Sequence, residues 1–317
     1  MQMSDLYNYS TGGTIHFVVN NQIGFTTTPM EARSSIYPTE LAKTIGAPIL
    51  HVNADDVLSV EKCCKFAAEY RNTFKKDIVI DLIGYRRFGH NELDQPSFTQ
   101  PLMYQQVNKR PNVLKLYEDQ LLNEGLLTED SAKKEYRDRI WNLMDEDYNK
   151  AKQLEADDQG WVPSEWDTIK VPKNYREFRN TGIDLNKFRE IGKQICTITK
   201  DFDAQKRVRK IYDARLKSIE EGKQIDWGTA EAMAFATLID EDFHVRISGQ
   251  DVERGTFSHR HSIVHNQSED EEYIPLQKFH SGRIRKFIST NSHLSENAVL
   301  GFEYGYSIVN PNSLTIW

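Results

Sequence analysis

Three amide side chains and a glycine follow the first apolar run of the sequence, residues 14–19. The segment at 20–24 reads Asn-Asn-Gln-Ile-Gly, and a buried strand ending this way can offer an amide oxygen and a backbone carbonyl to one cation. Hard cations such as Mg²⁺ take oxygen ligands and often share them with substrate phosphates. Open α/β sheets bind ligands at the carboxyl ends of their strands. Asn21 and the Ile23 carbonyl are therefore candidate metal ligands, with an ordinary Asn-containing turn as the alternative.

A second polar segment, Tyr-Arg-Arg-Phe-Gly-His-Asn-Glu at 85–92, follows the apolar run 78–83. Two arginines, a glycine and a histidine at the end of a strand can bind a diphosphate through charge-assisted hydrogen bonds. His90 is the candidate residue here. A solvated loop with a basic pair is the alternative.

A third candidate, Glu296, opens an apolar helical pattern directly after Ser295. Ser295 suits a helix N-cap, and a glutamate in the first turn gains about 0.3–1 kcal/mol from the helix dipole. That explains Glu296 locally. The functional alternative is a buried carboxylate that hydrogen-bonds a heterocyclic nitrogen, and spacing does not decide between the two.

Histidines gather in the last third of the chain, where six of the nine lie between His244 and His293. His259, His261 and His265 form a His-x-His-x-x-x-His pattern. On a strand, His259 and His261 would share one face, as zinc ligands can. Hydrogen-bonded or anion-binding loop histidines are the alternative.

Strand and helix patterns alternate around these candidates. The first part of the chain predicts strands at 14–19, 49–52 and 78–83, with helical spacing at 38–45 and 57–74 and Asp56 as a helix cap. A charged helical stretch at 112–152, a linker at 153–185 and a helical stretch at 185–221 are expected next. The last part predicts helices at 226–239 and 295–309 and strands at 245–248, 287–289 and 314–317. Such alternation predicts an α/β fold with parallel sheets flanked by helices.

Composition excludes several classes of function. The net charge is −7 and the pI is near 5.8, which argues against a general affinity for nucleic acid. No apolar run approaches the ~18 residues of a membrane span. The three cysteines, Cys63, Cys64 and Cys196, lack the spacing of a zinc site and are interpreted as small buried hydrophobes. We expect neither nucleic acid nor a membrane as partner.

Five segments together resemble the thiamine-diphosphate-dependent decarboxylating component of the 2-oxoglutarate dehydrogenase complex. They are residues 13–27, 51–56, 81–104, 245–267 and 294–317. The most specific are His-Val-Asn-Ala-Asp-Asp at 51–56, Gly-His-Asn-Glu-Leu-Asp-Gln-Pro at 89–96 and Ser-Gly-Gln-Asp-Val-Glu-Arg-Gly-Thr-Phe-Ser-His-Arg-His at 248–261. The resemblance spans nearly the whole chain and is weakest over 150–225.

This resemblance implies oxidative decarboxylation of 2-oxoglutarate, with transfer of the succinyl group to a lipoyl carrier in the citric acid cycle. Thiamine diphosphate and Mg²⁺ would lie between two domains, contributed by different subunits of a homodimer. Asn21 and the Ile23 carbonyl match magnesium ligands, His90 matches a loop histidine near the diphosphate, and Glu296 matches the glutamate that hydrogen-bonds the aminopyrimidine ring. The implied partner is the dihydrolipoyl succinyltransferase component. Alternatives are a 2-oxoadipate dehydrogenase component or a non-catalytic dimerisation and assembly module.

The chain also departs from the family pattern. An upstream Gly-Asp magnesium motif is absent, and a segment that follows Trp317 in the family is missing. We therefore expect an internal fragment, inactive by itself, with two truncated thiamine-diphosphate-binding-type domains. The expected division is a diphosphate-side domain at 1–150, a helical linker at 151–222 and the start of a pyrimidine-side domain at 223–317. The implied compartment is the mitochondrial matrix in a eukaryote and the cytoplasm in a bacterium.

Overall fold

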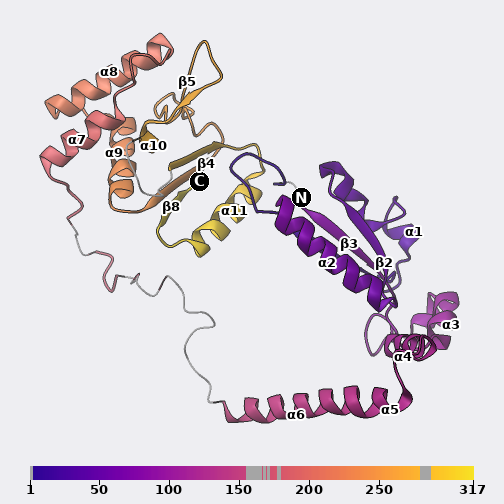
Figure 1. The fold of residues 1–317 in the computed structure, drawn as a ribbon. Helices are drawn as coiled ribbons and strands as arrows, with labels where there is room; N and C mark the ends of the chain where they lie inside the picture. The colour runs from indigo at the N-terminus through magenta and orange to yellow at the C-terminus, as the bar shows by residue number, and fades with distance from the viewer. Residues whose placement is uncertain (1–2, 155–165, 167–168, 170–171, 177–179, 279–286) are drawn as a thin grey trace. The chain divides into compact units, whose positions relative to one another are not determined.

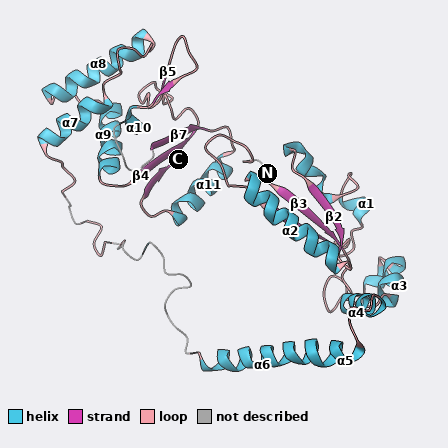
Figure 2. Cartoon of the chain, viewed as in Figure 1, coloured by secondary structure: helices cyan, strands magenta, loops and turns pink. Residues whose placement is uncertain are grey.

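The computed structural model describes residues 3–154, 166, 169, 172–176, 180–278 and 287–317. It divides into two compact units, Met1–Asp157 and Asp158–Trp317, and each contains helices packed on a three-stranded parallel sheet (Figures 1 and 2). The predicted α/β class is therefore confirmed. Within these described ranges, no helix has the length and apolarity needed to cross a membrane.

The sheet of the first unit is built from the three predicted strands. They are β1 (Ile15–Asn20), β2 (Ile49–Asn53) and β3 (Ile78–Ile83), in the order β1-β3-β2 and all parallel. The central strand β3 is buried on both sides, which explains its nearly continuous apolar sequence. Asn20 of β1 and Asn53 of β2 both pair with Ile83. The three carboxyl ends are therefore level at one edge.

Helix α2 (Val57–Phe74) has the predicted bounds and covers one face of this sheet (Figure 1). The Asp56 side chain accepts a hydrogen bond from the Ser59 backbone N–H at 3.0 Å, so the predicted cap is confirmed. The helix buries Ala67 against Ile78 and Ile80 of β3. The segment Pro38–Ile45, predicted to be helical, forms the 3₁₀ helix η1.

The remaining elements of the first unit are short helices, apart from one long helix near its end. They are α1 (Pro29–Ala32), η2 (Pro96–Phe98), α3 (Pro101–Lys109), α4 (Val113–Asn123), α5 (Glu129–Ser131), the π-helical η3 (Ala132–Arg137) and α6 (Asp138–Gln153). The helical stretch predicted at 112–152 is confirmed and consists of α4, α5, η3 and α6.

The second unit contains a parallel sheet and a small antiparallel ribbon. The sheet has the order β7-β4-β8, from β4 (His244–Gly249), β7 (Phe287–Asn291) and β8 (Ser313–Ile316). The ribbon pairs β5 (Val264–His265) with β6 (Glu272–Tyr273). The three sheet strands and their parallel arrangement confirm the prediction for this part of the chain.

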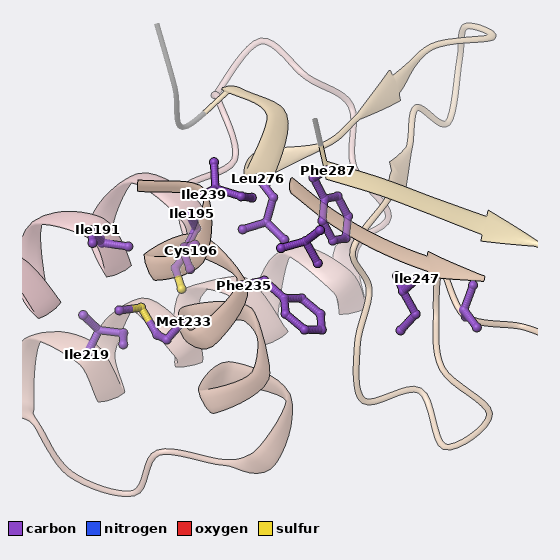
Figure 3. Close-up of a cluster of buried hydrophobic side chains, with 13 residues drawn as sticks. Ile191, Ile195, Cys196, Ile219, Met233, Phe235, Ile239, Ile247, Leu276 and Phe287 are labelled. Carbon is purple, nitrogen blue, oxygen red and sulfur yellow. The ribbon is translucent and has the colours of Figure 1, made fainter. Parts of the chain in front are cut away.

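Four helices share a buried core with one face of the second sheet (Figure 3). They are α7 (Leu185–Ile195), α8 (Lys206–Glu221), α9 (Trp227–Asp240) and α10 (Pro275–Lys278). Ile191 and Ile195 of α7 and Ile219 of α8 pack in this core with Phe235 of α9 and Phe287 of β7. Helices α7 and α8 thus belong to the second unit, whereas the sequence predicts a helical linker at 151–222. Most of the linker predicted at 153–185 lies outside the described residues.

The opposite face of the second sheet is covered by α11 (Glu296–Val309), which lies between β7 and β8 in the chain. Ser295 caps this helix by accepting a hydrogen bond from the Ala298 N–H, as predicted. The predicted helical stretch at 185–221 is instead two helices, because residues 196–205 form a loop between α7 and α8.

Close packing at Gly228, the second residue of α9, predicts a large effect of a single methyl group. A Cβ at Gly228 would lie 2.1 Å from the His259 carbonyl oxygen, whereas a Cβ at Gly301 of α11 would meet no atom within 4 Å. Gly228→Ala should lower the free energy of unfolding by about 1–3 kcal/mol through overpacking. Gly301→Ala, the matched control, should leave it unchanged or raise it by up to about 1 kcal/mol through helix propensity. Urea unfolding monitored by tryptophan fluorescence checks both, and equal stability of the two variants would contradict the packing at Gly228.

Candidate functional site

The loop after β1 is held in a tight turn by its own backbone and by Asn21. The Asn21 side-chain oxygen accepts a hydrogen bond from the Ile23 N–H at 3.2 Å, and Gly24 and Thr27 exchange two backbone hydrogen bonds. An amide oxygen has two lone pairs, so the Asn21 oxygen keeps one for a further partner. Among the described residues, no N–H or O–H donates to the Ile23 carbonyl. Both predicted oxygen donors can therefore accept an additional ligand.

Hydrogen bonds join this loop to the loop after β3. The Gln22 side-chain amide donates to the Gly84 carbonyl at 3.0 Å, and the Gly84 N–H donates to the Asn20 carbonyl at 3.0 Å. Residues 20–24 line an open pocket of about 210 Å³ together with Thr27, Pro29 and Arg33. The candidate donors thus border a solvent-accessible space.

His90 lies on the loop after β3 and meets the loop after β1. Its ring centroid is 5.3 Å from that of Phe25, and its backbone N–H donates to Asp94 at 3.5 Å. The imidazole is exposed. The structure therefore brings His90 and the segment containing Asn21 and Ile23 together at the carboxyl edge of one sheet.

The donor set around Asn21 suits a hard cation only in part. Amide and carbonyl oxygens are typical Mg²⁺ ligands, and this ion usually keeps several waters and binds substrate phosphates. In the part of the chain that the structure describes, no group of three or more His, Cys, Asp or Glu side chains could hold a metal ion. Asn21 and Ile23 could supply two oxygens, and the phosphate and water ligands of Mg²⁺ would come from elsewhere.

Sequence reasoning missed a buried acid next to this edge. Asp81 of β3 is fully buried, and its Oδ2 lies 2.8 Å from Nδ1 of His51 on β2. The His51 ring also contacts the Tyr37 ring in a tilted arrangement, with centroids 4.0 Å apart. An acid within an otherwise apolar strand needs a buried partner, so Asp81 itself was a usable signal. The sequence did not indicate that this partner is His51.

Glu296 occupies the first turn of α11, five residues after the last residue of β7. Its side chain is exposed in the second unit taken by itself, so the burial expected for a carboxylate facing a heterocycle is absent there. The position of Glu296 is therefore explained by the helix itself: its carboxylate lies at the positive end of the helix dipole, directly after the Ser295 cap. At this position it is also accessible to a ligand.

His259 and His261 do not lie on a strand; both are in a loop after β4. His261 is 7% exposed, with a left-handed φ of 48°, and its Nε2 is 3.0 Å from the Ser258 hydroxyl. Its backbone carbonyl accepts a hydrogen bond from the Tyr212 hydroxyl at 2.6 Å. The His259 carbonyl accepts one from Arg215 of α8 at 2.6 Å. Helix α8 therefore anchors the loop through backbone carbonyls. The His261 ring contacts the Ser258 hydroxyl, so His261 is a hydrogen-bonded loop histidine.

The chain belongs to the dehydrogenase E1 component family, a thiamine-diphosphate-dependent class of enzymes, as two family models indicate. Residues 1–158 match the model described as Dehydrogenase E1 component, and residues 223–317 match Transketolase, pyrimidine binding domain. The candidate edge with Asn21, Ile23 and His90 lies in the first match and Glu296 in the second.

Individual relatives make the resemblance specific. The chain is 46% identical over 316 residues to the protein named 2-oxoglutarate dehydrogenase, mitochondrial, of Schizosaccharomyces pombe, covering 98% of this chain and 31% of that protein. Its identity to the protein of the same name in Saccharomyces cerevisiae is 44%, covering 98% and 31% of the two chains. Its identity to the 2-oxoglutarate dehydrogenase E1 component of Brucella anthropi is 42%, covering 99% and 32%. The family resemblance is confirmed, and the chain spans about a third of the length of these curated relatives.

The environment of His261 predicts a pH-dependent stability. Burial, followed by the nearby Arg215 charge, lowers the pKa of His261 below its usual value. The unfolded chain then binds more protons than the folded chain as pH falls below about 6.5, so stability falls with it. His261→Asn, which tolerates the left-handed backbone, should therefore lose less stability than the wild type between about pH 7.5 and pH 5.

Urea unfolding at the two pH values checks this expectation, with His293→Asn at an exposed position as the control. His293→Asn should keep the wild-type pH dependence. If His261→Asn and the wild type lose the same stability on acidification, the lowered pKa is refuted.

Proposed function

We propose that this chain forms part of an E1 component that oxidatively decarboxylates 2-oxoglutarate and transfers the succinyl group to a lipoyl carrier. The observation that carries the proposal is the grouping of Asn21, Ile23 and His90 at one sheet edge. It is supported by 42–46% identity to proteins named 2-oxoglutarate dehydrogenase or its E1 component. The relatives' names favour 2-oxoglutarate over 2-oxoadipate.

In this proposal the first unit holds the diphosphate end of the cofactor. The Asn21 side-chain oxygen and the Ile23 carbonyl would hold Mg²⁺, which would neutralise part of the charge of the diphosphate. His90, positioned by the contact of its ring with Phe25, donates a hydrogen bond to a diphosphate oxygen. Thiamine diphosphate, when bound, supplies the electron sink for decarboxylation.

The second unit supplies the carboxylate of Glu296. Its place in the first turn of α11 leaves the side chain accessible, so a ring nitrogen of the aminopyrimidine can approach it. Glu296 then holds a proton between its carboxylate and that nitrogen. A bound cofactor would exclude water from this contact, and a lower local dielectric would strengthen the hydrogen bond.

The proposal includes the partners that the chemistry requires. A succinyl group leaving this site needs a lipoyl acceptor, which implies the dihydrolipoyl succinyltransferase component. We further propose a homodimer, with the mitochondrial matrix as compartment if the source is a eukaryote and the cytoplasm if it is a bacterium. Two relatives with mitochondrial names and one bacterial relative are the basis for these alternatives.

Metal binding at the first-unit edge can be tested on this chain with excess metal and cofactor, because we expect only weak binding by the fragment alone. Mn²⁺, added in place of Mg²⁺ with thiamine diphosphate, should broaden the amide resonances of Gly24 and Gly84 through its unpaired electrons. Asn21→Ala should abolish this broadening because it removes one of the two oxygen ligands. Asn53→Ala, at the level end of β2, is the matched control and should retain it. Unchanged broadening in Asn21→Ala would contradict the proposed ligand set.

Activity can be tested on the natural gene product that contains this chain, supplied with Mg²⁺ and thiamine diphosphate. Carbon dioxide release should be faster from 2-oxoglutarate than from 2-oxoadipate. Glu296→Gln should lower kcat by about 10²-fold or more, the range of general acid–base groups, because the amide cannot hold the proton. Asn297→Ala, at the adjacent exposed position, should keep wild-type turnover. No decarboxylation of either acid would refute the proposed function.

A further inference from the structure

The two faces of the second sheet differ in chemistry. Val245 and Ile247 of β4 point into the apolar core formed with α7, α8 and α9. Arg246 and Ser248 alternate with them and therefore point to the opposite face, which α11 covers. Helix α11 thus packs on polar side chains of the central strand.

A buried carboxylate of α11 joins these polar side chains. Glu303 accepts hydrogen bonds from Arg246 Nε at 2.7 Å and from Arg246 Nη2 at 2.8 Å. The Ser248 hydroxyl donates to Glu303 Oε1 at 2.7 Å. The side chains of Arg246 and Glu303 are only 2% and 4% exposed. One glutamate of α11 is therefore held by three hydrogen bonds from β4.

Aromatic rings of the same helix surround the guanidinium. The Arg246 side chain lies over the Phe302 ring at 5.2 Å and over the Tyr306 ring at 5.1 Å. A bidentate arginine–carboxylate pair has a narrow geometry, and these rings restrict it further. Any rotation or sliding of α11 along β4 would break these contacts.

Stability alone is a weak explanation for such a pair. Apolar residues of similar volume often replace a buried ion pair without loss of stability, because the desolvation cost offsets the attraction. A buried polar network can instead select one arrangement of the elements that it joins. The arrangement selected here is the rotation and axial position of α11 on β4.

This position bears directly on Glu296. Glu303 follows Glu296 by seven positions, nearly two helical turns, so both lie on one side of α11 about 10 Å apart along the axis. Val299, between them on this side, is 2% exposed and faces the sheet. The side that binds β4 through Glu303 therefore ends at Glu296, beside the carboxyl end of β7.

We propose that Arg246, Ser248 and Glu303 form a positioning network that sets where α11 presents the Glu296 carboxylate. The inference rests on the proposed function, in which Glu296 hydrogen-bonds the ring nitrogen of the aminopyrimidine. Glu303 is buried and acts through the helix, not by touching the cofactor. A change at Glu303 should therefore alter the contact with one ring atom of the ligand.

The test uses the natural gene product with Mg²⁺ and compares two ligands by calorimetry. One is thiamine diphosphate, and the other is its analogue with carbon in place of the ring nitrogen that meets Glu296. The wild type should prefer thiamine diphosphate. Glu303→Gln should weaken binding of thiamine diphosphate about 10-fold, the scale on which outer-shell partners act, and should leave binding of the analogue unchanged.

A double-mutant cycle distinguishes an effect on the position of Glu296 from a non-specific loss of structure. In the Glu296→Gln background, Glu303→Gln should have no further effect on the affinity for thiamine diphosphate, because the group that it positions has been changed. The double variant R246M/E303M replaces both charges together, so no unpaired charge is buried. If Glu303→Gln fails to fold, the ligand preference of R246M/E303M is measured in its place.

The position of α11 can also be tested without ligand, by hydrogen–deuterium exchange. Hydrogen–deuterium exchange of the amides in the first two turns of α11 should be faster in R246M/E303M than in the wild type. The matched control is R260M/E231M, which removes another doubly hydrogen-bonded Arg–Glu pair of the same unit, with contacts of 2.6 and 3.0 Å. This control should leave both the exchange of α11 and the preference for thiamine diphosphate unchanged.

The outcomes distinguish this inference from the function on which it rests. If the wild type binds the analogue as tightly as thiamine diphosphate, the proposed role of Glu296 fails, and the positioning network falls with it. If the wild type prefers thiamine diphosphate and both Glu303 variants keep that preference, only the positioning network is overturned. Additive effects in the cycle would overturn it as well.

Discussion

In a parallel sheet all strands run in one direction, so the loops that leave neighbouring strands emerge at a common edge. In the first unit this edge is level, because Asn20 and Asn53 both pair with Ile83. In the second unit Gly249 pairs with Asn291 in the same way. Asn21 and Ile23 follow the end of β1, His90 follows the end of β3 and Glu296 follows the end of β7, each within seven positions. The proximity of Asn21, Ile23 and His90 in the first unit thus depends on parallel pairing in register.

Buried charge pairs are the second feature that organises both units. In the first unit, Asp81 lies against His51, and Asp77 lies 3.0 Å from the His16 ring. In the second unit, Arg246 and Glu303 form a pair with almost no exposure. An unpaired charge in such places would be very costly, so these pairs constrain which elements can lie together. The polar face under α11 is the clearest case, since there the pair lies at the contact between helix and sheet.

Loops at the candidate edges are held by hydrogen bonds to backbone atoms. Gln22 of the first loop bonds the Gly84 carbonyl, and Arg215 of α8 bonds the His259 carbonyl. Such contacts fix the path of a loop and leave its outward-facing groups available for a ligand. They also explain why α8 belongs to the second unit: its side chains anchor the loop that follows β4.

The sequence by itself determined the local features of this protein. The bounds of α2, its Asp56 cap, strand β3 and the Ser295 cap of α11 follow from patterns within a few residues, because hydrophobic spacing and capping are local effects. The family was likewise readable from short motifs. Only the tertiary structure decided which distant residues meet. Arg246 and Glu303 are 57 positions apart, and His51 and Asp81 are 30 apart. These partners are set by strand register and by helix packing on the sheet, which the periodicity of a single segment does not encode.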